Sequence, residues 1–180
     1  MTPSSEKLWK STEGKIFTPP HGFKQAGVVE SASILDKKPG FARQSRRISP
    51  AKKAGLAYER KVQDYLGNLF GDFYLPGIWF SFYAGGYAGR RYAQPDGLLF
   101  DLERGVITIV EVKIRHTTRA WWQLRELYQP LVEFKFPDWG VEVVEVFNYF
   151  DKKEAVPEKV MHVGEVDLPT QVYKMKKLML

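Results

Sequence analysis

The sequence predicts an α/β fold: a central mixed sheet flanked by helices, preceded by an irregular basic N-terminal extension. Three observations predict it. Apolar residues recur at helical spacing over 51–70, strand patterns fill 78–114, and a second helical pattern followed by a strand pattern occupies 118–150. In chain order these elements run αβββαβ. The 180 residues therefore divide into an extension (1–50), a core (51–152) and a C-terminal extension (153–180).

The extension at 1–50 contains several helix and strand breakers and shows no sustained periodicity. Residues 1–53 contain 11 Lys or Arg against 4 Asp or Glu, whereas 54–180 contain 16 against 17. A basic arm on a near-neutral domain suits a polyanion, so we expect Arg46 and Arg47 to contact nucleic acid. A solvated tail is the alternative.

The helix predicted at 51–70 begins after Ser49 and Pro50, which favour a helix start. At about 100° per residue, Glu59 falls on its apolar face, between Leu66 and Phe70. A carboxylate there is either a ligand that reaches into a site or a boundary glutamate paired with a core polar group.

The strands are predicted at 78–83, 94–102 and 106–114, with a turn at 103–105. A glycine-rich loop at 85–91 carries Arg90 and Arg91, which suit contact with phosphates and exposed bases; a plain mobile connection is the alternative. A helix is predicted from 118 to about 129, where Pro130 ends or kinks it. A strand follows at 141–150, and 153–180 holds at most an edge strand and a tail.

The strand at 106–114 is apolar on both faces, yet it contains Glu111 and Lys113 on the same face. A buried ion costs several kcal/mol unless a partner or a metal compensates it. A two-residue turn at 103–104 places Asp96 opposite Glu111, and one at 104–105 places it opposite Lys113. Either register brings Asp96, Glu111 and Lys113 together.

Two carboxylates with few other donors form an oxygen-ligand site of the kind that binds Mg²⁺. The alternative is an ion network that only stabilises the hairpin. No cysteine is present, the three histidines are scattered, and no HExxH or GxSxG string occurs, so thiol chemistry is excluded and a metal site would use oxygen ligands.

The segments QPDG at 94–97 and EVK at 111–113, with Glu59 on a preceding helix, resemble the PD-(D/E)XK nuclease superfamily. The resemblance covers about 51–150 and implies a restriction-endonuclease-like (resolvase-like) core. It implies that Asp96, Glu111 and the carbonyl of Val112 bind Mg²⁺, for which Mn²⁺ substitutes. It also implies that Lys113 orients or deprotonates the attacking water and that Glu59 assists the metal directly or through water.

Gln123 matches a glutamine found in some exonuclease-like and resolvase-like branches of this superfamily. Those branches often have a tyrosine four residues later, where this sequence has Leu127 and then Tyr128. An endonuclease is therefore favoured over an exonuclease. Arg115 and His116, at the end of the 106–114 strand, either touch the scissile phosphate or lie on the surface.

The function expected is Mg²⁺-dependent hydrolysis of phosphodiester bonds, with DNA preferred to RNA and a homodimer compatible with the resemblance. The alternatives are a nuclease fold that binds nucleic acid without cutting it and a protein-interaction domain. Residues 1–10 lack the apolar core of a signal peptide, and no run approaches the ~20 apolar residues that span a bilayer. We therefore expect an intracellular, cytoplasmic or similar, location and neither secretion nor membrane partners.

Overall fold

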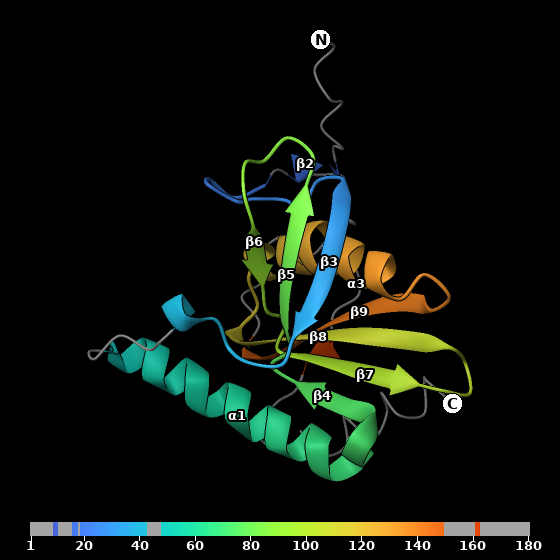
Figure 1. Cartoon of the computed structure of the whole chain (residues 1–180). Helices are drawn as coiled ribbons and strands as arrows, with labels where there is room; N and C mark the ends of the chain where they lie inside the picture. The colour runs from blue at the N-terminus through green and yellow to red at the C-terminus, as the bar shows by residue number, and fades with distance from the viewer. Residues whose placement is uncertain (1–8, 11–15, 18, 43–47, 150–160, 163–180) are drawn as a thin grey trace.

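A computed structural model describes residues 9–10, 16–17, 19–42, 48–149 and 161–162 of the chain (Figure 1). The fold is mixed α/β, as predicted, with a five-stranded and a three-stranded sheet among these residues. A two-stranded pair, β1 (Trp9–Lys10) with β2 (Ile16–Phe17), lies near the N-terminus. Arg46, Arg47 and the predictions for 153–180, except at 161–162, lie outside the described residues.

The five-stranded sheet holds the strands on which the candidate site lies, in the order β10-β9-β8-β7-β4. Its strands are β4 (Tyr74–Pro76), β7 (Gly97–Asp101), β8 (Val106–Arg115), β9 (Gly140–Tyr149) and β10 (Met161–His162). It is mixed, as predicted, because β8 runs parallel to β9 and antiparallel to β7. The central position of β8 explains its apolar residues on both faces.

The three-stranded sheet corrects the prediction for 78–83. The strand found there, β5 (Trp79–Ala84), pairs with β3 (Val29–Leu35) and β6 (Arg91–Ala93), not with the central sheet. The strand beside β7 is β4, which sequence analysis did not predict because it spans only three residues and ends in Pro76. The strand predicted at 94–102 is shorter in the structure, where β7 spans Gly97–Asp101, because 94–96 carry the chain from β6 in one sheet to β7 in the other.

The predicted irregular extension is wrong for 26–35. Ala26 is fully buried and its N–H donates to the Glu126 carbonyl at 2.7 Å, while β3 pairs with β5 along six positions. Sequence analysis missed this strand because it is an edge strand in which exposed residues occur on both faces, so its polar and apolar residues do not alternate. A short 3₁₀ turn, η1 (Gly40–Ala42), follows it.

Helix α1 (Pro50–Phe70) confirms the first predicted helix. Ser49 caps it, since its Oγ accepts from the Lys52 N–H at 3.3 Å, and Pro50 occupies the first turn. The 3₁₀ turn η2 (Gly71–Phe73) leads into β4. Helix α1 covers one face of the five-stranded sheet through a buried cluster: Val62, Leu66, Tyr74, Leu99, Val110, Val112 and Val146.

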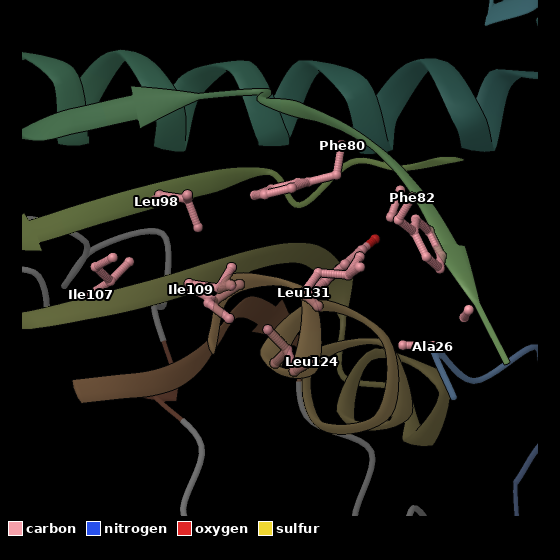
Figure 2. Close-up of a cluster of buried hydrophobic side chains, with 12 residues drawn as sticks. Ala26, Phe80, Phe82, Leu98, Ile107, Ile109, Leu124 and Leu131 are labelled. Atoms are coloured by element: carbon pink, nitrogen blue, oxygen red, sulfur yellow. The ribbon is translucent and has the colours of Figure 1, made fainter. Parts of the chain in front are cut away.

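The opposite face is covered by a continuous helical segment composed of α2 (Thr118–Trp122), the π-helix η3 (Gln123–Tyr128) and α3 (Gln129–Lys135). Figure 2 shows the cluster between this segment, β5 and the sheet, where Leu124 and Leu131 approach Ile109 and Phe80. The helix does not end at 129 as predicted. Pro130 lies in the first turn of α3, where a missing N–H and a fixed φ are tolerated.

Glycine at position 97 is required by packing. The Tyr74 ring lies so close that a Cβ built on Gly97 would come within 2.4 Å of it. Through this contact Tyr74 packs β4 against the first residue of β7. Among the described residues, no helix combines the length and the apolar character needed to cross a membrane.

Candidate active site

The β7–β8 hairpin sets the position of the candidate catalytic residues. Gly97 pairs with Val110 and Asp101 with Val106, so Asp96 comes level with Glu111, the first of the two predicted registers. The connection is four residues long, not two, but the even length preserves the predicted pairing. Asp101 closes the turn, because its Oδ1 accepts from the N–H groups of Glu103 and Arg104 at 3.1 and 3.0 Å.

Asp96 lies where the chain crosses between the sheets, and its backbone and side chain are both held. Its carbonyl accepts from the Gly77 N–H at 2.9 Å and from Gln63 Nε2 at 3.2 Å. Its carboxylate Oδ2 accepts from the Val112 N–H at 2.6 Å. The carboxylate is therefore oriented onto β8, beside Glu111.

Glu111 and Lys113 form an ion pair through Glu111 Oε1 and Lys113 Nζ. The Glu111 side chain is 2% exposed and that of Lys113 is 31% exposed, so the pair connects the interior to solvent. The second oxygen, Glu111 Oε2, is buried and has no hydrogen-bond partner among the described residues. Leaving such an acceptor unsatisfied costs about 1 to 3 kcal/mol or more, which calls for an explanation.

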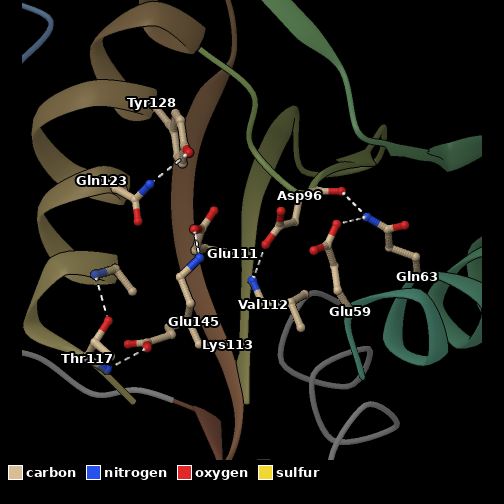
Figure 3. Close-up of polar contacts among 11 residues, drawn as sticks. Glu59, Gln63, Asp96, Glu111, Val112, Lys113, Thr117, Gln123, Tyr128 and Glu145 are labelled. Atoms are coloured by element: carbon tan, nitrogen blue, oxygen red, sulfur yellow. Dashed lines mark hydrogen bonds and ion pairs between the residues drawn. The ribbon is translucent and has the colours of Figure 1, made fainter. Parts of the chain in front are cut away.

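Glu59 approaches the same spot from α1 (Figure 3). Gln63, one turn later on the same helix, donates from Nε2 to Glu59 Oε1 at 3.2 Å as well as to the Asp96 carbonyl. Asp96 lies between Glu59 on one side and Glu111 with Lys113 on the other. Gln63 was missed from the sequence, although its spacing of four from Glu59 placed it on the same helix face.

The environment of this site disfavours the charged forms of its carboxyl groups. Burial, followed by the nearby charge of Asp96, raises the pKa of Glu111 to about 8. Burial also raises the pKa of Asp96, and burial together with Asp96 raises that of Glu59. Burial lowers the pKa of Lys113, but the Glu111 and Asp96 carboxylates outweigh it and raise that pKa overall. A positive charge placed between the carboxylates would offset their repulsion.

These residues fit a divalent cation that needs few protein ligands. Within the described part of the chain, no group of three or more His, Cys, Asp or Glu side chains is arranged to hold a metal ion. Mg²⁺, however, is usually bound through one or two carboxylates and keeps waters or substrate phosphates as its other ligands. Asp96 and Glu111, with the unpartnered Oε2, supply that number of carboxylates. The contact shown for Val112 is its N–H to Asp96, so the role of its carbonyl stays a prediction.

Glu145 is a buried carboxylate that sequence reasoning missed. It lies on β9 directly beside Glu111 and is 2% exposed. Its Oε2 lies 2.7 Å from His116 Nδ1, and its Oε1 accepts from the Thr117 N–H at 3.3 Å. The signal was present, because Glu145 stands between valines in a strand with apolar residues on both faces, as Glu111 does.

The π-helix η3 brings Gln123 and Tyr128 together. Gln123 Nε2 donates to the Tyr128 hydroxyl at 3.3 Å, and burial followed by the charges of Glu111 and Asp96 raises the pKa of Tyr128. In a π-helix the backbone bonds run between residues five apart, so such residues lie above one another. The tyrosine at the fifth position therefore lies where an α-helix would present the fourth. Figure 3 shows Gln123 with Tyr128 on the Glu111 side of the site, and the catalytic role of Gln123 stays a prediction.

Comparisons with protein-family models, with curated proteins and with solved structures returned no significant match to this chain.

The residues predicted to contact nucleic acid differ in their exposure and in their hydrogen-bond partners. Arg90 and Arg115 are exposed, whereas Arg91 donates to the Ala26 and Lys24 carbonyls and stacks over the Tyr87 ring. His116 is fully buried, so both expectations for it, phosphate contact and surface placement, are corrected. The imidazole can lie in the interior because its Nδ1 is hydrogen-bonded to the buried Glu145 carboxylate. For the three arginines a role in binding stays a prediction.

Proposed function

We propose that this protein is a metal-dependent nuclease that hydrolyses phosphodiester bonds. One observation carries the proposal: Asp96 and Glu111 meet beside Lys113, and Glu111 keeps a buried oxygen that no described residue satisfies. A bound cation would give that oxygen a partner and would offset the repulsion between the carboxylates, and a substrate phosphate would supply further ligands to the cation. The preference for DNA over RNA, and products with 5′-phosphate and 3′-hydroxyl ends, rest on the resemblance to the PD-(D/E)XK superfamily.

In this proposal Asp96 and Glu111 hold Mg²⁺, or Mn²⁺ in its place, while Glu59 and Gln63 support the site from α1. The ion, when bound, polarises the phosphoryl oxygens and lowers the pKa of a bound water. Lys113 is partly exposed, so its ammonium can reach an incoming phosphate, orient the attacking water and stabilise the charge that develops during displacement. Gln123 lies at the edge of this group through its bond to Tyr128.

A restriction-endonuclease-like core is part of the proposal. The elements around the five-stranded sheet run α1, β4, β7, β8, the α2–α3 segment and β9, which supports the αβββαβ order with β4 in the position first assigned to 78–83. Endonuclease action is favoured over exonuclease action, and a homodimer stays a prediction.

The test is cleavage of supercoiled plasmid by the full chain with Mg²⁺ and with EDTA. We expect cleavage with Mg²⁺ only, and loss of about 10³-fold in rate for Lys113→Ala and for Asp96→Asn, as for removal of one group that stabilises a transition state. Lys135→Ala is the matched control, because Lys135 is exposed at the end of α3 and should keep the wild-type rate. Equal activity in EDTA, or full activity of Lys113→Ala, would reject the proposal.

A nucleic-acid-binding module without catalysis is the second candidate. The observation in its favour is that no described group of three metal-ligating side chains is already assembled. In that case the protein would bind DNA with the same affinity in EDTA and in Mg²⁺, and neither Mg²⁺ nor Mn²⁺ would support cleavage of any linear, branched or circular substrate.

A further inference from the structure

A pocket of about 460 Å³ lies beside the candidate active site. Its volume is within the range of pockets that enclose a small organic ligand, about 300 to 1,000 Å³. Segments distant in the sequence contribute to it: residues 22–24, η1, β6, and the first turns of the α2–η3 segment. Because these segments come together only in the folded chain, no local sequence pattern indicates the pocket.

The charged side chains that line the pocket are all basic. They are Lys24, Arg90, Arg91 and Arg119. Arg91 is held in place, since two of its nitrogens donate to backbone carbonyls and its guanidinium lies 4.1 Å from the centre of the Tyr87 ring. Arg119 is exposed on α2, and its side chain has no ion pair or hydrogen bond with another described residue. The pocket therefore presents fixed and available positive charge to an anion.

Aromatic rings form another part of the wall. Phe41 is 67% exposed, although it contacts the Tyr92 ring edge-on at a centroid distance of 4.8 Å. The open Phe41 ring lies beside arginines in the same pocket, so it can stack on a flat partner. Positive charge that follows a phosphate backbone, with aromatic rings for bases, is the combination by which proteins bind single strands.

The pocket and the candidate active site share a wall. Gln123 lines the pocket, and its side chain donates to the Tyr128 hydroxyl. Burial and the nearby charges of Glu111 and Asp96 raise the pKa of that hydroxyl. Gln123 therefore connects the pocket to the candidate active site.

We propose that this pocket binds an unpaired nucleotide, its base against Phe41 and Tyr92 and its phosphate on Arg119 and Lys24, so that the substrate is a strand with a single-stranded segment. This inference rests on the proposed function for its link to cleavage, but binding itself needs no metal. A paired base offers only its edges in the grooves, whereas stacking on Phe41 needs an exposed face, which is why the unpaired form is selected.

The experiment measures binding in EDTA by fluorescence anisotropy, using the full chain, a short labelled single-stranded DNA and the blunt duplex of the same sequence. We expect the single strand to bind about tenfold more tightly than the duplex, as for one stacked base. Equal or tighter binding of the duplex would overturn the inference.

Variants locate the binding. Arg119→Glu and, separately, Phe41→Ala should each weaken single-strand binding about tenfold. Both residues are exposed, so neither change should affect folding, which circular dichroism verifies. Lys61→Glu makes the same charge change on the exposed side of α1 and should have less than half the effect of Arg119→Glu on the logarithm of the affinity. Equal losses for Arg119→Glu and Lys61→Glu, or no loss for Phe41→Ala, would overturn the inference.

Competition and catalysis separate the remaining outcomes. A deoxynucleoside monophosphate should displace the labelled strand at lower concentration than inorganic phosphate; equal competition would reduce the pocket to a simple anion site and overturn the inference. Lys135→Ala, the exposed control at the end of α3, should bind the single strand as the wild type does. Normal single-strand binding without cleavage in Mg²⁺ would reject the proposed function and leave this inference standing. Cleavage that Arg119→Glu and Phe41→Ala leave unchanged would reject this inference and leave the proposed function standing.

Discussion

Glu111 and Glu145 lie side by side on the two parallel strands at the centre of the sheet, and each is 2% exposed. Glu145 has both oxygens engaged, one with His116 and one with the Thr117 N–H. Glu111 has one oxygen paired with Lys113 and one without a partner among the described residues. Their positions are nearly equivalent, but the satisfaction of their hydrogen bonds is not.

The difference indicates that Glu145 has a structural role, whereas Glu111 keeps the open oxygen that the proposed function uses. Glu145 is compensated by neighbours that follow β8 directly, and it ties the end of that strand to the start of α2. Glu111 is compensated by an ammonium that also reaches solvent, and it keeps capacity for another ligand. Satisfied polar groups rigidify a core, whereas an unsatisfied one marks a place where binding energy is still to be gained.

The largest contrast is expected in activity. Glu111→Gln should lower the Mg²⁺-dependent cleavage rate about 10³-fold, because the variant loses a carboxylate that faces the proposed metal and phosphate. Glu145→Gln keeps an acceptor oxygen for His116 and should lose about tenfold or less, as expected of a group that only orients others. Initial rates of plasmid nicking measure both, and equal losses would remove the distinction.

Stability should show the reverse order. Glu145→Ala leaves His116 and the Thr117 N–H without their carboxylate in a buried place, which we expect to cost about 3 kcal/mol of unfolding free energy. Glu111→Ala removes an unpartnered oxygen and its repulsion with Asp96, and it frees Lys113, which can turn to water, so the cost should be smaller. Urea denaturation without metal tests this. A larger loss for Glu111→Ala would favour a purely structural ion network.

Cation binding sharpens the comparison further. Ca²⁺ should bind without supporting turnover, while Mn²⁺ should support it, since the site has only oxygen ligands. At a concentration 100-fold above Kd, Ca²⁺ should raise the unfolding free energy by about 2.7 kcal/mol. Glu145→Gln should keep this gain and Glu111→Gln should lose it. The same thermal shift in both variants would place the cation elsewhere.

The last contrast is in the pH dependence of stability. Because the folded-state pKa of Glu111 is raised to about 8, the native protein holds a proton between pH 5 and 8 that the unfolded chain has released. Stability of the metal-free protein should therefore fall as pH rises through this range, and the raised pKa of Asp96 acts in the same sense at its lower end. Glu111→Gln should flatten the slope in chemical denaturation. Stability that rises with pH in both proteins would contradict the assignment.

The parts of the site that local patterns could predict are those set by periodicity. Helical spacing placed Glu59 on the inner face of α1, and strand alternation with an even turn placed Asp96 on the same face as Glu111 and Lys113. Both depend on geometry that repeats along a few residues, so they do not require knowledge of the rest of the fold. The central position of β8 followed from its apolar residues on both faces in the same way.

The parts that sequence reasoning missed depend on which elements meet. No local sequence pattern indicates that β5 pairs with β3 in a separate sheet, or that the three-residue strand β4 lies beside β7. His116 was misplaced because its burial depends on Glu145, which is 29 residues away. Tertiary partners decide such cases, and they override weak local preferences for strand or surface.

The π-helix between Gln123 and Tyr128 has an implication for chain length. Backbone bonds over five residues in place of four accommodate one surplus residue without moving either flanking helix. Deleting Leu127 would convert the turn to α-helical geometry and place the tyrosine four residues after the glutamine, the spacing often found in the nuclease branches that the sequence resembles. The π-helical turn thus lets this segment hold one residue more than an α-helix would, and retention of the core packing of Leu124 and Leu131 in the deletion variant would show that the fold tolerates either length.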